Sequence, residues 1–147
     1  MLVIITAMVM VAVPYATRSN DGLALDQACR DVAEGLKYAL SHATDSRRPT
    51  RFVVDLTEKS YALEAIGAVD GRTFEPLEDA RGRTRYLESK VGIVDVEGFA
   101  VTGKNRYGLV FDPFQPWPYA SMALAIEDAL ATVRVAGKVV HIEAEPG

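Results

Sequence analysis

The first seventeen residues constrain the fold of this chain most, because residues 1–17, MLVIITAMVMVAVPYAT, carry no charge and the first charged side chain is Arg18. A domain of 147 residues can bury an ordinary core and has no need to begin with an uninterrupted apolar run. The segment therefore lies in a bilayer, is removed, or packs against a partner. As a helix, residues 1–16 would span roughly 24 Å. That is somewhat shorter than the usual transmembrane helix of about 20 residues.

A cleaved secretory signal is the alternative to an anchor. The length of the apolar run fits, and Pro14-Tyr15-Ala16 offers small residues near a cleavage point. No Lys or Arg precedes the run, whereas a signal peptide begins with a positively charged region. In an anchor, Pro14 would kink the helix, which a membrane tolerates.

A second helical pattern follows from Leu23. Apolar residues recur at steps of three and four and predict one stripe of an amphipathic helix. The stripe consists of Leu25, Ala28, Cys29, Val32, Leu36, Ala39, Leu40 and Ala43. We expect the helix to end by Asp45, because a polar stretch and Pro49 follow. Cys29 lies on the stripe and is expected to be a small core residue.

From Phe52 onward the apolar period changes to two, which predicts strands. Residues 52–56 and 61–65 indicate a hairpin, and residues 67–82 read as a long loop. Further strands are expected at 85–87, 91–96, 107–111, 122–126, 132–135 and 139–142. Residues 112–119, DPFQPWPY, hold three prolines and three aromatic rings, so we expect a rigid surface loop there.

These patterns predict an α+β fold, in which the later half of a long N-terminal helix packs on an antiparallel sheet. The apolar half of the helix has nothing left to cover and is expected to project. We therefore divide the chain into a membrane or filament-core helix, residues 1–22, and a globular domain, residues 23–147.

Composition excludes several classes of function. The formal net charge of −4 and the pI of about 5.2 argue against a globally basic nucleic-acid binder. Cys29 is the only cysteine, and no Cys/His cluster has zinc spacing, so no metal or other cofactor is expected. Asp112, Ser121 and His141 supply the residue types of a catalytic triad, but no nucleophile motif surrounds Ser121, so we expect no enzyme activity.

The order of these parts resembles the type IV pilin-like proteins, in particular the H-type minor pseudopilins of type II secretion and the related FimT-like minor pilins. Three stretches carry the resemblance. The first is LVIITAMVMVAVP, which resembles the membrane half of the pilin helix with its kink proline at Pro14. The second is residues 36–63, ending KYALSHATDSRRPTRFVVDLTEKSYAL, and the third is Leu109-Val110-Phe111-Asp112-Pro113 with the strands around residues 133–135 and 137–139.

The resemblance implies a pilin-like fold and a structural role without catalysis. It implies a single-pass protein of the bacterial inner membrane with its globular domain in the periplasm, and other pseudopilins and secreted cargo as partners. The residues expected in the membrane and in helix bundling are Leu2, Val3, Ile4, Ile5, Val9, Val11, Val13 and Pro14. The family's processing site, a Gly-Phe pair with a Glu four residues after the Phe, does not precede this segment. We therefore expect the segment to be the truncated remainder of a pilin-type helix.

Two surface stretches are candidate contact sites. Phe114, Trp117 and Tyr119 are candidates for a protein interface, because aromatic rings anchor interfaces. Alternatively, Trp117 folds back over the edge of the sheet.

Arg81, Arg83 and Arg85 form the most basic local patch. Residues 82–85, GRTR, match the GRxR pattern with which FimT-like proteins contact DNA, although that pattern is C-terminal in the family. DNA uptake is thus the runner-up function, and a solvated loop is the simpler interpretation of the patch. A secreted β-rich domain with a signal peptide is the third alternative.

Overall fold

Helix α2 (Asn20–Ser46) is the longest element of this computed structural model, which describes residues 20–67, 71–77, 82–127 and 129–145. The predicted stripe is its buried face, where Cys29, Val32 and Ala39 are fully enclosed. The helix ends within one residue of the predicted position. There Ser46 Oγ donates a hydrogen bond to the carbonyl of His42 at 2.6 Å, and Arg47 turns the backbone into the left-handed region at φ 58°.

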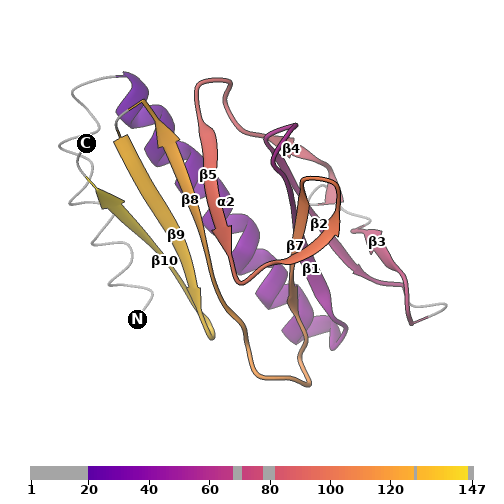
Figure 1. Cartoon of the computed structure of the whole chain (residues 1–147). Coiled ribbons are helices and arrows are strands. Elements are labelled where there is room, and N and C mark those ends of the chain that lie inside the picture. The colour runs from indigo at the N-terminus through magenta and orange to yellow at the C-terminus, as the bar shows by residue number, and fades with distance from the viewer. Residues whose placement is uncertain (1–19, 68–70, 78–81, 128, 146–147) are drawn as a thin grey trace.

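The strands of the described residues form two antiparallel sheets (Figure 1). Sheet A has the order β3-β2-β1-β7-β6, with β4 also pairing with β2, and sheet B has the order β10-β9-β8-β5. The strands of sheet A are β1 (Thr50–Asp55), β2 (Ser60–Ile66), β3 (Phe74–Pro76), β4 (Arg85–Tyr86), β6 (Ala100–Gly103) and β7 (Arg106–Phe111). The strands of sheet B are β5 (Gly92–Glu97), β8 (Tyr119–Ile126), β9 (Ala129–Ala136) and β10 (Val139–Glu145).

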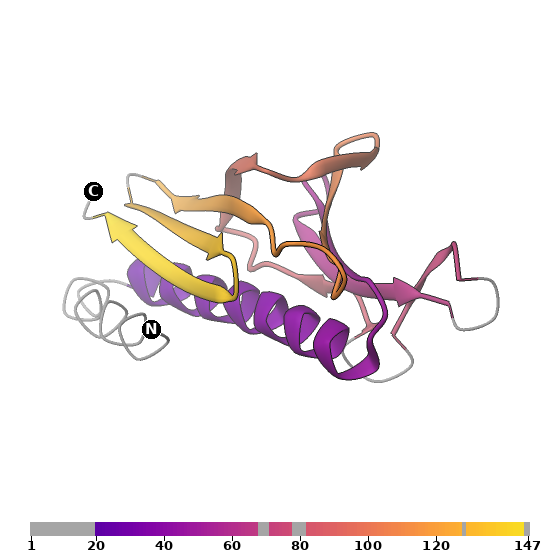
Figure 2. The same cartoon turned by 90° about the horizontal axis from the view of Figure 1, so that it is seen from below.

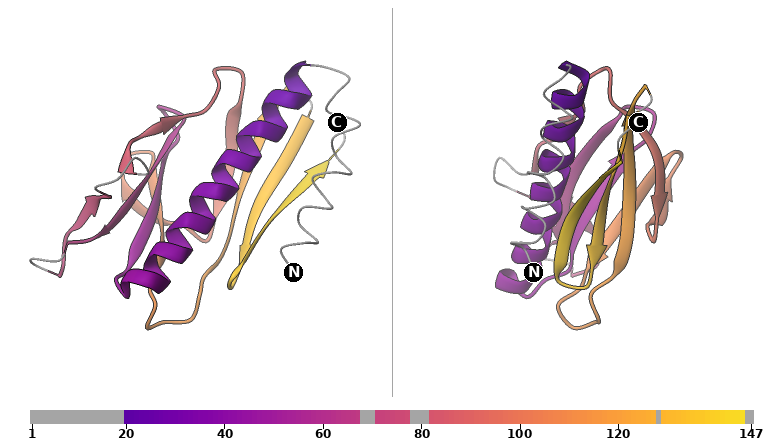
Figure 3. Two further views of the ribbon diagram at one scale, coloured as in Figure 1. Left: turned by 180° about the vertical axis from the view of Figure 1, so that it is seen from behind. Right: turned by 90° about the vertical axis from the view of Figure 1, so that its left-hand side faces the viewer.

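Helix α2 lies diagonally across one face of both sheets (Figures 2 and 3) and contacts β8, β9 and β10 as well as β1, β2 and β7. One hydrophobic core therefore joins the helix to both sheets. The ring of Phe52 on β1 stacks on Tyr61 at 5.4 Å and meets Phe99, between β5 and β6, edge-on at 6.5 Å. Gly35 lets the helix approach, because a Cβ there would lie 3.1 Å from the Phe52 ring.

The predicted α+β fold is confirmed, and so are the β1–β2 hairpin and the loop before β8. Two strands were not predicted. The expectation of a continuous loop over residues 67–82 is wrong for Phe74–Pro76, because those residues pair with the end of β2 as β3. Strand β6 is fully exposed and shows no apolar alternation that could have revealed it. The predicted apolar half of the helix, and residues 1–19 as a whole, lie outside the described residues, so the boundary at residue 22 stays a prediction.

Cys29 occupies the core position expected for it. Burial raises the pKa of its thiol to about 12, and the negative charge of Asp26 adds to the effect. Because the thiolate is the reactive form, the side chain behaves as an inert apolar group at neutral pH.

The chain passes from sheet B to sheet A at Gly98. Its φ of +80° lies in the region that favours glycine, and a Cβ there would lie 2.4 Å from the carbonyl oxygen of Tyr119. No L side chain fits this position without moving the start of β8. The direct crossing from β5 to β6 therefore requires glycine at this position.

We expect Gly98→Ala to lower the free energy of unfolding by at least about 2 kcal/mol, because it adds a clash with backbone to an unfavourable φ. Gly103→Ala is the matched control, since a Cβ there meets nothing closer than 3.7 Å. Urea denaturation of both variants measures the difference. Equal midpoints for the two variants would show that Gly98 does not constrain the crossing.

Candidate functional site

The aromatic loop between β7 and β8 divides into exposed and packed rings. Phe114 is 71% exposed and Tyr119 is 68% exposed. Trp117 is half-buried and packs on the core, with its ring 6.2 Å from that of Phe111. The carboxylate of Asp112 accepts a hydrogen bond from the Phe114 backbone at 2.9 Å and fixes the first turn of the loop.

The indole of Trp117 thus packs over the edge of the core. This agrees with the alternative that Trp117 folds back over the edge of the sheet. Phe114 and Tyr119 present their rings to solvent on either side of it. A protein interface formed by Phe114, Trp117 and Tyr119 stays a prediction. Phe114 and Tyr119 are the two rings that are exposed enough to contact a partner.

The two described arginines of the basic patch lie on the helix side of β4, and the next residue, Tyr86, lies on the opposite side. Arg85 pairs with Tyr61 of β2, whose ring lies in the core under α2, and Tyr86 pairs with Ser60 on the opposite face. Arg83 and Arg85 line a small cavity of about 20 Å³ against the helix, which we call the inner cavity. Arg81 lies outside the described residues.

Asp31 and Glu34 of α2 line the same inner cavity as Arg83 and Arg85. Two carboxylates beside two guanidinium groups lower the local positive potential. Binding to DNA draws on cations that converge on phosphates. The neighbouring carboxylates of α2 therefore do not favour convergence of these two arginines on a phosphate group.

A second cavity, of about 180 Å³, opens on the face of sheet A that points away from the helix. We call it the outer cavity, and its polar lining consists of Asp55, Glu58, Ser60, Thr84, Tyr86 and Arg106. Four of these residues form one row across four strands, because Tyr86 pairs with Ser60, Ser60 with Asp55, and Asp55 with Arg106. Sequence reasoning missed this cavity, since the row exists only in the register of strands far apart in the chain.

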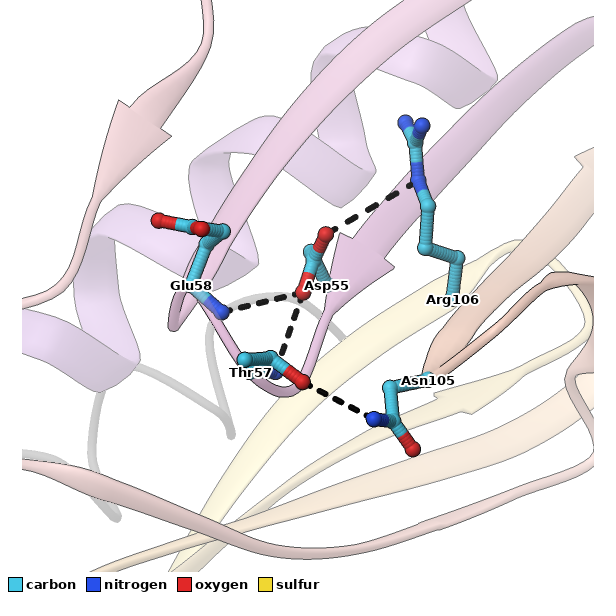
Figure 4. Close-up of polar contacts among 5 residues, drawn as sticks. All are labelled: Asp55, Thr57, Glu58, Asn105 and Arg106. Atoms are coloured by element: carbon cyan, nitrogen blue, oxygen red, sulfur yellow. Dashed lines mark hydrogen bonds and ion pairs between the residues drawn. The ribbon is translucent and has the colours of Figure 1, made fainter.

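Two turns support the rim of the outer cavity (Figure 4). Asp55 Oδ1 accepts hydrogen bonds from the backbone of Thr57 at 2.9 Å and of Glu58 at 3.0 Å, while Arg106 Nε lies 4.0 Å from Asp55 Oδ2. Asn105 Nδ2 donates to Thr57 Oγ1 at 2.9 Å and thereby joins the β1–β2 turn to the β6–β7 turn. The carboxylate of Asp55 is therefore held in a fixed position.

The residues considered as a triad are not brought together. Arg134 on the middle strand β9 pairs with Ser121 of β8 on one side and with His141 of β10 on the other. Two strand spacings, roughly 10 Å, therefore separate Ser121 from His141. His141 Nε2 lies 3.2 Å from Glu143, whose pKa is lowered chiefly by its hydrogen bond to Arg134. Asp112 caps its own loop. This arrangement lacks the hydrogen-bonded geometry of a triad.

Among the described residues, no group of three or more His, Cys, Asp or Glu is arranged to hold a metal ion. In the same part of the chain, the helix is not apolar enough over its length to span a membrane. The predicted membrane residues, from Leu2 to Pro14, lie outside the described residues.

Comparison with known proteins finds similarity in structure alone. No protein-family model matches the chain, and no curated protein matches it significantly. Two structures of the minor pseudopilin EpsH from the type II secretion system of Vibrio cholerae are similar, with TM-scores of 0.61 and 0.62. The first EpsH structure is 11% identical in sequence to this chain and covers 82% of this chain and 95% of EpsH. The second is 13% identical and covers 88% of this chain and 98% of EpsH.

The type IV minor pilin FimU of Pseudomonas aeruginosa is similar as well, with a TM-score of 0.55 and 17% identity over 83% of this chain and 88% of FimU. At these identities the likeness shows the fold. The resemblance to minor pseudopilins and minor pilins is thus confirmed as a pilin-like fold.

We expect Trp117→Ala to lower the free energy of unfolding by about 2–4 kcal/mol, because it removes the ring that packs on Phe111. Phe114→Ala should change it by less than about 0.5 kcal/mol, since that ring is exposed. Thermal denaturation of both variants measures the two effects. A loss of unfolding free energy for Trp117→Ala as small as that for Phe114→Ala would mean that the Trp117 ring contributes no packing.

We expect the protein and its Arg83→Ala/Arg85→Ala variant to shift duplex DNA equally poorly in a gel at physiological salt, because Asp31 and Glu34 offset the two arginines. Asp31→Asn/Glu34→Gln is the informative control, since removing both carboxylates should increase binding to phosphate. A strong shift by the unmodified protein that the arginine variant loses would instead support DNA recognition.

Proposed function

We propose that this chain is a non-enzymatic minor subunit of a pilin-like filament, of the H type that belongs to type II secretion pseudopili. One observation carries the proposal: the fold is that of EpsH, and an uncharged apolar segment directly precedes the helix that holds the two sheets together. In this proposal the apolar segment of residues 1–17 serves first as a membrane anchor and then as part of the filament core.

The apolar stripe of α2 supports separate roles for the helix and for the apolar segment that precedes it. Its residues from Leu25 to Ala43 are buried against the sheets of the same chain and are not available to another helix. Residues 2–14 are apolar and uncharged, a composition suited to lipid first and to the helices of other subunits afterwards.

We place the subunit in the bacterial inner membrane as a single-pass protein, with residues 23–147 in the periplasm. Its proposed partners are other pseudopilins and secreted cargo, which would contact the surface of the globular domain. Extraction of the anchor into a helix bundle is a mechanical step that requires no bond-making chemistry in the subunit. The separation of Ser121 from His141 agrees with this role.

We expect deletion of the gene in its host to reduce the release of type II secreted proteins into the medium by at least tenfold, with the full chain restoring release. A chain that begins at Leu23 should not restore it, because it lacks the apolar segment. The full chain should sediment with membranes, and the shorter chain should remain in the periplasmic fraction when exported.

Three outcomes separate the alternatives. Loss of surface pili with normal secretion would place the subunit in a type IV pilus, and loss of DNA uptake alone would support the FimT-like role. Recovery of mature protein that begins near Thr17 would favour a secreted domain. Complementation by the chain that begins at Leu23 would overturn the proposal.

A further inference from the structure

The outer cavity differs in chemistry from the rest of sheet A. Its floor is apolar, formed by Val53, which is 3% exposed, and by Ala62. Its volume of about 180 Å³ is below the roughly 300–1,000 Å³ of pockets that enclose drug-sized ligands. A space of this size admits one long side chain.

The charge of the outer cavity is negative. Arg106 lies beside Asp55, whose Oδ1 is already engaged by two backbone N–H groups. Glu58 also contributes a carboxylate, which extends away from Asp55 in Figure 4, and no described residue forms an ion pair with it. Two carboxylates against one guanidinium leave one negative charge uncompensated, and Glu58 carries it.

A serine hydroxyl group that opens on the cavity is a second polar feature of the site. Ser60 is 5% exposed and lines the cavity, yet no described residue forms a hydrogen bond with its side chain. Among the described residues, no buried side-chain nitrogen or oxygen lacks a hydrogen-bond partner, so the Ser60 hydroxyl is open to the cavity and available to a ligand. Ser60 pairs with Tyr86 on one side and with Asp55 on the other, so it lies in the middle of the polar row.

An exposed aromatic ring completes the lining. Tyr86 is 67% exposed although it lies in a strand, and Thr84 precedes it on the same face. A guanidinium group can stack on such a ring while its N–H groups reach a carboxylate and a hydroxyl. A carboxylate or phosphate ligand would be repelled by Glu58, and the guanidinium group of the described lining, Arg106, already lies beside Asp55.

We propose that the outer cavity is a docking site for an arginine side chain of a partner protein. The guanidinium stacks on Tyr86, pairs with Glu58 and donates a hydrogen bond to Ser60, while its aliphatic stem covers Val53. The site lies on the face of sheet A opposite to α2, so a docked partner does not compete with the packing of the helix. The inference does not depend on assembly into a filament.

The test is an NMR titration of the full ¹⁵N-labelled chain in detergent micelles with N-acetyl-arginine amide. We expect saturable shifts of the Ser60 and Tyr86 backbone amides with a Kd in the millimolar range, because the ligand combines ring stacking, an ion pair and a hydrogen bond at one site. N-acetyl-citrulline amide, which has the same shape and no charge, should produce no saturable shift.

Three variants assign the contacts. Glu58→Gln and Tyr86→Ala should each weaken binding at least fivefold, while Glu88→Gln, an exposed carboxylate outside the cavity, should leave it unchanged. The amide spectrum away from the cavity reports whether each variant is folded. Since these positions lie at the surface rim, their substitution should not disturb the core.

The proposal is overturned if N-acetyl-citrulline amide shifts the same amides or if Glu58→Gln binds the arginine probe as well as the unmodified protein does. It is also overturned if the arginine probe causes no saturable shift up to a concentration of about 10 mM. Free L-arginine provides the last comparison. If it binds more than tenfold better than the capped probe, the cavity recognises a small molecule, and docking of a partner protein is excluded.

Discussion

The structure depends on burial of one apolar face of α2. The edge strands that face the division between the sheets, β5 and β6, each pair with a single neighbour, and the described strands of sheet A form no ladder with those of sheet B. The helix and the side chains beneath it therefore hold the two sheets together. Val32, Leu36 and Ala39 contribute buried surface on the helix side, and Phe52 and Val133 contribute it from the two sheets. Removing the helix would leave two sheets with open apolar faces.

This dependence explains which parts of the fold could be predicted from the sequence. The stripe from Leu25 to Ala43 and the hairpin around residues 52–65 are local patterns with clear periods, and both were predicted correctly. Strands β3 and β6 could not be predicted because they are short edges formed by pairing with a neighbour, not by their own composition. The division into two sheets was likewise not predictable, since the chain passes between the sheets three times, after β4, after β5 at Gly98 and after β7, and no local pattern marks these crossings.

The candidate sites follow the same rule. Aromatic and basic residues were recognised by type, but their environment is set by contacts distant in sequence. Trp117 lies on Phe111, and Arg85 lies beside the carboxylates of α2. The outer cavity has no sequence motif, because its members come from four strands, the β1–β2 turn and the connection that precedes β4. Residue type indicated which chemistry was present, and only the strand register showed which groups face one another.

Strand β4 is only two residues long, yet it supplies a side chain to each of the two cavities. Arg85 points toward the helix and Tyr86 points away from it, as the alternation of a strand requires. A slip of β4 by one residue along β2 would exchange the two faces. A guanidinium group would then enter the outer cavity, and a phenol would face Asp31 and Glu34. The register of β4 against β2, more than its composition, therefore determines the sign of the charge that each side of sheet A presents to other molecules.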